Sequence, residues 1–202
     1  MMAYKLKVMI VGDSGVGKTS FVANLTNETY FIRHIPTVID FAAYHTSAYG
    51  FNFKLLLQDT TSIPDYNDMR TAFYRHSHII FLCFSLANPE TFENVKNKWW
   101  SEIQQFAPDK PVILVGLKED LKTDRLVQKR LERKRLSFVT TREGRNLAKE
   151  LGFSSYVEMS AKWKDDARKV VDEALRIFCV PEVEEEPKSV LRRLFGRFWR
   201  RD

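Results

Sequence analysis

The residues best suited to chemistry lie near the start of the chain, in the glycine-rich segment GDSGVGKT at residues 12–19. The pattern G-x-x-x-x-G-K-[ST] binds phosphate when a strand precedes it and a helix follows it. The apolar run at residues 4–11 predicts that strand, and residues 20–25 predict that helix. Backbone N–H groups of such a loop, together with the helix N-terminus, form a nest for phosphate oxygens. We therefore predict a nucleotide phosphate site at Ser14, Gly15, Val16, Gly17, Lys18, Thr19 and Ser20.

Three side chains carry the chemistry expected at this site. Lys18 is expected to reach the β- and γ-phosphates, and the Thr19 hydroxyl is expected to ligate Mg²⁺. Asp59 closes a later strand-like run, at residues 51–58, in the manner of an acidic residue that holds Mg²⁺ through water. The sequence therefore predicts a phosphate site with a magnesium ion beside it.

The elements that must position these residues alternate along the chain. Gly50 separates two strand-like runs and predicts a hairpin turn. Strands alternating with helices predict an α/β fold, with a doubly wound, mostly parallel six-stranded sheet and helices on both faces. In such sheets ligands bind at the carboxyl ends of the strands, where the glycine-rich loop lies. The predicted strands are residues 4–11, 40–49, 51–58, 78–84, 111–116 and 155–159, the helices 20–25, 89–106, 122–135, 141–151 and 165–178, and the main loops 26–37 and 59–68.

Composition narrows the class of protein. The two cysteines, Cys83 and Cys179, indicate neither a disulfide framework nor a metal site in a chain of 202 residues. No apolar stretch is long enough to span a membrane and no signal peptide precedes the first strand, so a reducing, cytoplasmic location is expected. Residues 188–202 hold six basic residues and one acidic residue and supply +5 of the net charge of +6. The charge is therefore expected in this tail, and no nucleic acid is expected as a partner.

Two further motifs each follow a predicted strand: KED at residues 118–120 and SAK at residues 160–162. Together with the phosphate loop, they make the chain resemble the small GTPases of the Ras superfamily, and within it the Rho/Rac family. Lys118 and Asp120 match the last elements of the family motif [NT]-K-x-D, directly after the strand predicted at residues 111–116. The likeness to Rho proteins rests on residues 98–103, KWWSEI, and on the charged residues 122–135, which fall where Rho proteins carry an insert helix. The second motif, which matches Ser-Ala-[KL], comprises Ser160, Ala161 and Lys162.

The resemblance, which covers residues 4–178, implies a P-loop NTPase G domain at residues 1–180 that binds GTP or GDP with Mg²⁺. A carboxylate at Asp120 would accept two hydrogen bonds from guanine that adenine cannot offer, and a site built for this pairing rejects adenine. The Lys118 stem would pack over the base, and the Ala161 N–H would donate to guanine O6.

Two switch segments complete the site that the resemblance implies. Tyr30 lies where the family has an aromatic residue covering the edge of the base. Thr37 is expected to touch the γ-phosphate and to share Mg²⁺ with the two metal-holding residues named above. Effector proteins are expected at residues 30–44 and 60–72 of a protein that acts as a monomer.

The chain departs from the family at the residues of catalysis. Where the family has Asp-Thr-Ala-Gly-Gln-Glu, residues 59–64 read DTTSIP. Ser62 thus replaces the glycine that meets the γ-phosphate, and Ile63 replaces the glutamine that positions water. Ser14, at a glycine position of the phosphate loop, would crowd an arginine supplied by a GTPase-activating protein. No catalytic residue is intact, so we expect very slow GTP hydrolysis.

Other departures concern the base and the effectors. Leu117 replaces Asn or Thr directly before Lys118, which removes a polar tether between the base motif and the phosphate loop. In the first switch, His34, Ile39 and Ala42 replace tyrosine, phenylalanine and the effector-binding tyrosine of the family. We therefore expect that the usual effectors are not recognised.

Three hypotheses about function follow. The first is a Rho-type signalling switch that binds guanine nucleotide, hydrolyses GTP poorly and exists mainly with GTP. The second is a pseudo-GTPase, an interaction module with weak or no nucleotide binding, which Leu117 favours. The third is a competent GTPase in which another residue orients water.

Residues 181–202 are predicted to be an acidic linker followed by a basic amphipathic tail. On a helix, residues 188–201 would present apolar side chains on one face and arginines on the other, a pattern typical of helices that lie on anionic membranes. The alternative is a helix that docks on the domain or on a partner. The last four residues are not a Cys-a-a-X box, so no prenyl anchor is expected and the tail would attach the protein to the inner face of a membrane. The apolar residues of the tail are Val190, Leu191, Leu194, Phe195, Phe198 and Trp199.

Overall fold

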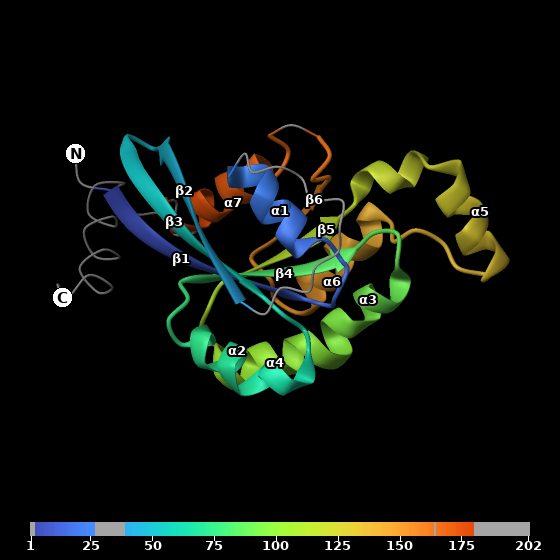
Figure 1. The fold of residues 1–202 in the computed structure, drawn as a ribbon, viewed down its shortest axis with the longest axis horizontal. Helices are drawn as coiled ribbons and strands as arrows, with labels where there is room; N and C mark the ends of the chain where they lie inside the picture. The colour runs from blue at the N-terminus through green and yellow to red at the C-terminus, as the bar shows by residue number, and fades with distance from the viewer. Residues whose placement is uncertain (1–2, 27–38, 164, 180–202) are drawn as a thin grey trace.

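A computed structural model describes residues 3–26, 39–163 and 165–179, and a six-stranded sheet runs through its centre (Figure 1). The strands are β1 (Ala3–Gly12), β2 (Ile39–Ala48), β3 (Phe51–Thr60), β4 (Ile79–Ser85), β5 (Val112–Leu117) and β6 (Ser155–Met159). They lie in the order β2-β3-β1-β4-β5-β6. β2 runs antiparallel to β3, and every other neighbouring pair is parallel. The mostly parallel six-stranded sheet predicted from the sequence is confirmed.

The strands form where the sequence offers apolar runs and a suitable turn. Every residue of β4 and of β5 is buried, as expected for strands covered on both faces. β2 and β3 are joined by Tyr49 and Gly50, whose φ angles of 52° and 79° lie in the left-handed region. A two-residue turn with this backbone matches the twist of a hairpin. The hairpin predicted at Gly50 is therefore confirmed.

Helices cover both faces of the sheet (Figure 1). On one face lie α1 (Lys18–Thr26) and α7 (Arg168–Cys179). On the other lie α2 (Asn67–Tyr74), α3 (Pro89–Asn94), η2 (Val95–Trp100), α4 (Ser101–Phe106) and α6 (Thr141–Glu150). Two short helical segments, η1 (Pro64–Tyr66) and η3 (Glu119–Thr123), lie in connections between strands and helices. α5 (Arg125–Arg133) projects from the right-hand end of the molecule in Figure 1.

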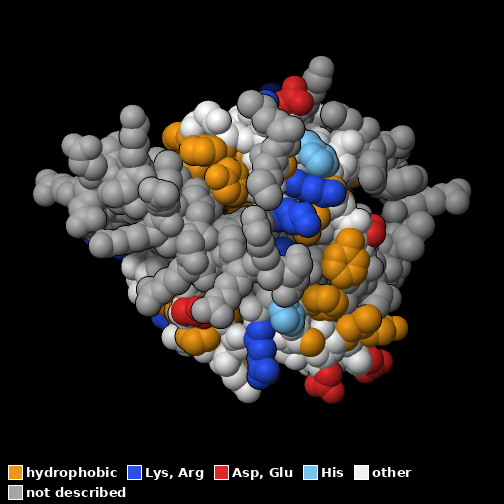
Figure 2. Space-filling model, turned by 90° about the vertical axis from the view of Figure 1, so that its left-hand side faces the viewer, with side chains coloured by type: hydrophobic (Ala, Val, Ile, Leu, Met, Phe, Trp, Pro, Cys, Tyr) orange, Lys and Arg blue, Asp and Glu red, His pale blue; other side chains and the backbone are white. Residues whose placement is uncertain are grey.

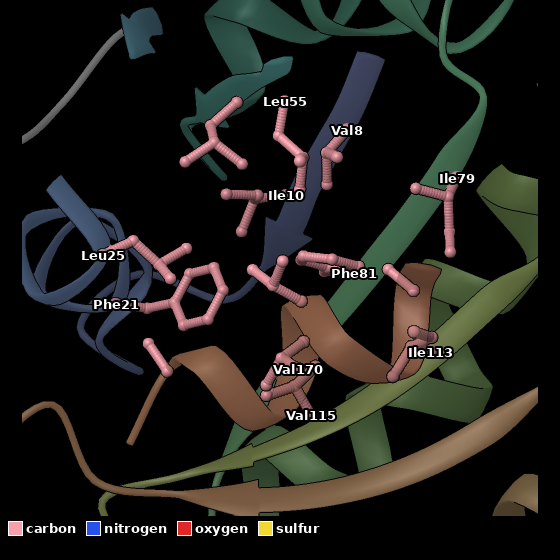
Figure 3. Close-up of a cluster of buried hydrophobic side chains, with 14 of the residues drawn as sticks. Val8, Ile10, Phe21, Leu25, Leu55, Ile79, Phe81, Ile113, Val115 and Val170 are labelled. Atoms are coloured by element: carbon pink, nitrogen blue, oxygen red, sulfur yellow. The ribbon is translucent and has the colours of Figure 1, made fainter. Parts of the chain in front are cut away.

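Two hydrophobic cores join these layers. Figure 3 shows the core beneath α1 and α7, where Phe21 of α1 and Val170 of α7 meet Phe81 of β4. The rings of Phe21 and Phe81 pack edge to face, with their centres 5.9 Å apart. On the other face, the largest fully buried hydrophobic side chains are Trp99 and Tyr74. β1 contributes to both cores, so the loop that follows it starts from a strand fixed on two sides.

The long helix predicted over residues 89–106 is present, but its middle segment η2 is π-helical. Its hydrogen bonds span one residue more than those of an α-helix, and such turns occur frequently at functional sites. η2 brings Trp99 to the phosphate loop, where its Nε1–H donates to Asp13 Oδ1 at 2.9 Å. The helix predicted over residues 89–106 is therefore confirmed, and its π-helical middle segment is a detail that the sequence did not predict.

The loop predicted at residues 59–68 is wrong in part. β3 continues to Thr60, η1 begins at Pro64, and the first residues of α2 fall within the range. The polar, proline-containing sequence around Pro64 has the composition of a loop, which conceals the helical segment. The charged helix predicted within residues 122–135 is present as α5, and the Asp124 carboxylate caps it.

Figure 2 shows the end of the molecule opposite α5, where hydrophobic, basic and histidine side chains are interspersed. Within the described residues, no helix is long and apolar enough to cross a membrane. The tail predicted at residues 181–202 lies outside the described residues.

Candidate nucleotide-binding site

The glycine-rich loop joins the end of β1 to the start of α1, and its first position requires glycine. A Cβ on Gly12 would lie 2.1 Å from the carbonyl oxygen of Cys83, its partner on the neighbouring parallel strand β4, so there is no room for a side chain. Gly15 and Gly17 have φ angles of 73° and 116°, which other residues rarely adopt. Ser14 and Gly15 are exposed at the tip. The loop is thus fixed at its base and open at its tip.

Lys18, the first residue of α1, is buried beneath this loop. Its Nζ donates to the carbonyl oxygen of Gly12 at 2.8 Å and to that of Asp13 at 2.9 Å. Burial lowers the pKa of Lys18, and the carboxylate of Asp59 offsets this only in part. An ammonium group has three donors. The two carbonyl bonds therefore hold the head group in place and leave it able to donate to an anion.

Thr19 and Asp59 meet at the position predicted for Mg²⁺. The Thr19 hydroxyl donates to Asp59 Oδ2 at 2.6 Å. Asp59 is 2% exposed, and its other oxygen, Oδ1, is buried with no hydrogen-bond partner among the described residues. Burial raises the pKa of Asp59, although the Thr19 hydrogen bond and the charge of Lys18 act in the opposite direction.

A hard cation prefers oxygen ligands, and it would satisfy the buried Oδ1 of Asp59. In the described part of the chain, no three Asp, Glu, His or Cys side chains converge on one point. A cation here would therefore take most of its ligands from phosphate and water, as Mg²⁺ does in phosphoryl-transfer sites. The residues present fit Mg²⁺.

A pocket of about 230 Å³ opens where the phosphate loop meets the two later motifs. Its lining residues are Gly17, Ser20, Leu117, Lys118, Asp120, Leu121, Ser160, Ala161 and Lys162. All of them except Leu117 and Leu121 are residues that the sequence predicted for the site. The structure thus brings both base motifs to the same pocket as the phosphate loop.

Asp120 is held firmly in the wall of this pocket. Its Oδ1 accepts a hydrogen bond from Ser160 Oγ at 2.6 Å, and its Oδ2 lies 2.8 Å from Lys162 Nζ. Burial alone would raise the pKa of Asp120, but the hydrogen bonds from Lys162 and Ser160 outweigh it and lower the pKa. Each carboxylate oxygen has two lone pairs. Ionised Asp120 can therefore accept further hydrogen bonds from a ligand.

The base motif and the phosphate loop are linked even without the polar tether that Leu117 removes. Lys118 Nζ donates to the carbonyl oxygen of Gly15 at 2.6 Å. Leu117 is buried in the same hydrophobic core as Val16 of the phosphate loop. A hydrogen bond and apolar packing thus hold the two loops together, a compensation that our sequence reasoning missed.

The second switch segment follows β3. Thr61 is buried, whereas Ser62 and Ile63 are half-buried. The Ile63 N–H donates to the Thr61 hydroxyl at 3.2 Å, and the Thr61 carbonyl accepts from Arg70 Nη1 at 2.9 Å. The Ile63 side chain has neither a donor nor an acceptor. The segment is therefore fixed by Thr61 and Arg70, and position 63 offers no side-chain hydrogen bond to a water molecule.

A buried network, also missed from the sequence, connects this segment to the phosphate loop. Arg70 pairs with both carboxylate oxygens of Glu102, at 2.8 and 2.6 Å, and its guanidinium lies 5.1 Å from the centre of the Trp99 ring. Asp13 in turn accepts from Trp99 Nε1 at 2.9 Å and from Asn94 Nδ2 at 2.7 Å. The tryptophan was visible in the sequence as part of a family pattern, but nothing there pairs it with Asp13.

Two predicted site residues, Tyr30 and Thr37, lie outside the described residues, as does the departure His34. The described part of the site therefore comprises the phosphate loop, Asp59 and the two base motifs.

Comparison with known proteins agrees with this arrangement. The model of the Ras family matches residues 7–179. The chain belongs to the Ras family of small GTPases. The Ras-like GTP-binding protein RhoL of Drosophila melanogaster is 38% identical to it over 184 residues, which cover 91% of this chain and 90% of that relative. Ras-family proteins are GTP-binding switches that use guanine nucleotide with Mg²⁺, and the Ras-type G domain predicted from the sequence is confirmed.

Proposed function

We propose that this Ras-family protein is a Rho-like switch that binds GTP with Mg²⁺, hydrolyses it very slowly and is mainly GTP-bound. The observation that carries guanine binding is the pocket in which Asp120 faces the same space as the phosphate loop. Similarity to the RhoL relative supports the Rho assignment, as does α5 at the place expected for an insert helix.

Guanine selectivity would come from Asp120. Its carboxylate would accept hydrogen bonds from guanine N1–H and N2–H₂, while Ser160 and Lys162 keep it ionised and correctly turned. Adenine lacks this pair of donors, so a site built around it rejects adenine. Lys118 would lie against the base and the Ala161 N–H would meet guanine O6.

Phosphate and metal would be held by the residues around the loop. Lys18 would turn a donor to the β- and γ-phosphates, and the loop from Ser14 would surround them with backbone N–H groups. Thr19 and Thr37 would ligate Mg²⁺, and Asp59 would hold it through water. Bound Mg²⁺ supplies neutralisation of phosphate charge.

Slow hydrolysis is argued from the residues that should position water. Phosphoryl transfer depends mainly on positioning and on stabilising charge. Ile63 cannot orient a water molecule, and Ser62 adds a side chain beside the expected γ-phosphate position. Ser14 stands at the exposed tip of the loop, where an incoming arginine would have to pass. Since such an arginine is worth about 10³–10⁵ in rate, its exclusion would remove the usual stimulation.

The test is single-turnover hydrolysis of preloaded GTP, with and without a Rho-family GTPase-activating protein. We expect a very slow rate, no stimulation, and a faster rate in Ile63→Gln. Ile63→Leu is the matched control, because it keeps an apolar side chain of similar size and should not accelerate hydrolysis. An ordinary family rate in the unmodified protein, or strong stimulation by the activating protein, contradicts the proposal.

A pseudo-GTPase is the second candidate, and Leu117 favours it. This buried residue cannot form the hydrogen bond that would tie the base motif to the phosphate loop, and losing such a bond costs about 1–3 kcal/mol. The nucleotide extracted from purified protein separates the candidates. GTP supports the slow switch, GDP indicates a competent GTPase, and the absence of nucleotide supports an interaction module.

The partners and domain limits belong to the same proposal. Effectors would bind at the two switch regions, residues 30–44 and 60–72, of a monomeric domain formed by residues 1–180. The basic tail at residues 188–201 would hold this cytoplasmic protein on the inner face of a membrane.

A further inference from the structure

α5 and the residues directly after it carry a concentrated positive charge. Residues 125–135 hold six basic residues and a single acidic residue, Glu132. All six basic side chains are exposed, and none forms an ion pair with another described residue. They are Arg125, Lys129, Arg130, Arg133, Lys134 and Arg135. The excess positive charge was expected in residues 188–202 alone, so this segment is a second place where it gathers.

Three of the basic side chains form a row on the outward face of α5. Arg125, Lys129 and Arg133 follow one another at intervals of four residues, which places them in a row along the helix. Leu126 lies beside this row and is 79% exposed. Leu131, on the other side of the helix, is buried and attaches it to the domain. α5 projects from the end of the molecule (Figure 1). Its outward face therefore presents a row of cations with one exposed apolar side chain beside it.

We propose that the outward face of α5 binds the anionic headgroups of a membrane surface. An anionic bilayer offers a dense, adaptable layer of negative charge, to which each nearby Lys or Arg adds attraction. It needs no matching groove, which suits a projecting helix of nine residues. An exposed leucine among these cations can also enter the boundary between headgroups and acyl chains.

Other anionic partners fit this face less well. A specific protein interface buries roughly 800 Å² on each partner around an apolar centre from which lysine is depleted. A helix of nine residues, about 14 Å long, is too short and too rich in cations for that. A nucleic acid would match the row of cations, but its phosphate backbone gives Leu126 no apolar surroundings.

The first experiment asks whether α5 itself meets the bilayer, whatever the tail does. In the full chain, Leu126→Cys is labelled with a polarity-sensitive fluorophore, since the native Cys83 and Cys179 are buried. Arg142→Cys, at an exposed position of α6, is the matched control. Vesicles of phosphatidylcholine with 30% phosphatidylserine should shift the emission of the label at residue 126 to the blue, and those of phosphatidylcholine alone should not. Without that shift, or with an equal shift at residue 142, the proposal is overturned.

The second experiment measures the contribution of charge. The triple variant Arg125→Gln, Lys129→Gln, Arg133→Gln should bind the phosphatidylserine vesicles about fivefold more weakly for each cation removed, or roughly a hundredfold in all. The control variant Arg142→Gln, Arg145→Gln, Lys149→Gln removes the same charge from exposed positions of α6 and should retain most of the binding. Circular dichroism serves as the check that both variants are folded.

Three results would overturn the proposal in this experiment. One is unchanged vesicle binding by the α5 variant. Only the tail would then bind the membrane, and a version ending at Pro187 would lose the binding. Another is an equal loss in the α6 variant, which would mean that only net charge matters. The third is that a 20-base-pair DNA duplex binds the full chain, loses that binding in the α5 variant, and competes off the vesicles.

Discussion

The buried carboxylate of Asp59 opposes folding when it is ionised. Burial raises its pKa, Thr19 and Lys18 reduce the effect without cancelling it, and one oxygen has no donor among the described residues. A carboxyl group with a raised pKa stabilises the folded protein at low pH, where it is protonated, and this advantage is lost as the pH rises through the folded-state pKa. A cation beside Asp59 would remove the penalty at neutral pH.

Asp59→Asn is therefore expected to raise the free energy of unfolding of the nucleotide-free protein at pH 7, by about 1 kcal/mol. The same change should weaken Mg²⁺-dependent GTP binding by about 10–100-fold, because it alters a group that orients the ion. Urea denaturation measures the gain in the free energy of unfolding at two pH values, pH 7 and a pH below the ordinary aspartate pKa. The gain should vanish at the lower pH. Asp109→Asn, at an exposed site, is the control, and a less stable Asp59→Asn protein at pH 7 would contradict the argument.

Among the elements, α2 is fastened to α4 by a buried ion pair. Glu102 of α4 accepts two hydrogen bonds from Arg70 of α2 and a third from the Tyr74 hydroxyl, at 2.8 Å. Arg70 is fully buried and also holds the Thr61 carbonyl, so the pair fixes the path of the second switch segment. Removing one partner of such a pair leaves an uncompensated charge in the interior.

Glu102→Ala is expected to lower the free energy of unfolding by about 3–5 kcal/mol, because Arg70 would stay buried without its counter-charge. Glu150→Ala is the matched control. It breaks the exposed pair of Glu150 with Lys96, and it should cost less than about 1 kcal/mol. Urea denaturation compares the two variants. Similar losses in the free energy of unfolding would show that the buried ion pair contributes no more to stability than the exposed one.

The elements also show what the sequence could and could not predict. A turn with a local requirement was predicted correctly, namely the hairpin at Gly50, whose φ is 79°. The π-helical turn was not predicted, because it accompanies a hydrogen bond between Trp99 and Asp13, which lie 86 residues apart in the chain. Arg70 was missed for a similar reason, since a charged residue in a polar segment gives no local sign that it will be buried.

At the candidate site too, local features could be predicted from the sequence and long-range contacts could not. The phosphate loop and the base motif around Asp120 are short motifs, so their residues could be named from the sequence, and the structure gathers them at one pocket. The bonds that set their geometry join distant segments, such as Ser160 to Asp120 and Lys118 to Gly15. Only the fold shows these pairs.

For the whole molecule, nucleotide binding should stabilise the fold through mass action. At a GTP concentration of a hundred times Kd, with Mg²⁺, the gain is about 2.7 kcal/mol, or roughly 5–10 °C in Tm for a domain of this size. ATP should give no comparable shift, and Asp120→Ala should abolish the preference for GTP. Thermal unfolding of protein freed of nucleotide makes the measurement, and equal shifts with ATP and GTP would refute guanine selectivity.

The position of β4 between β1 and β5, with every residue buried, has a consequence for hydrogen exchange. Its amide protons should exchange with deuterium only when the whole domain opens, because no partial opening uncovers the centre of the sheet. A ligand that binds only the folded protein then slows this exchange in proportion to 1 + [L]/Kd. Hydrogen exchange in β4 should therefore slow when a ligand fills the pocket, although no residue of β4 lines that pocket.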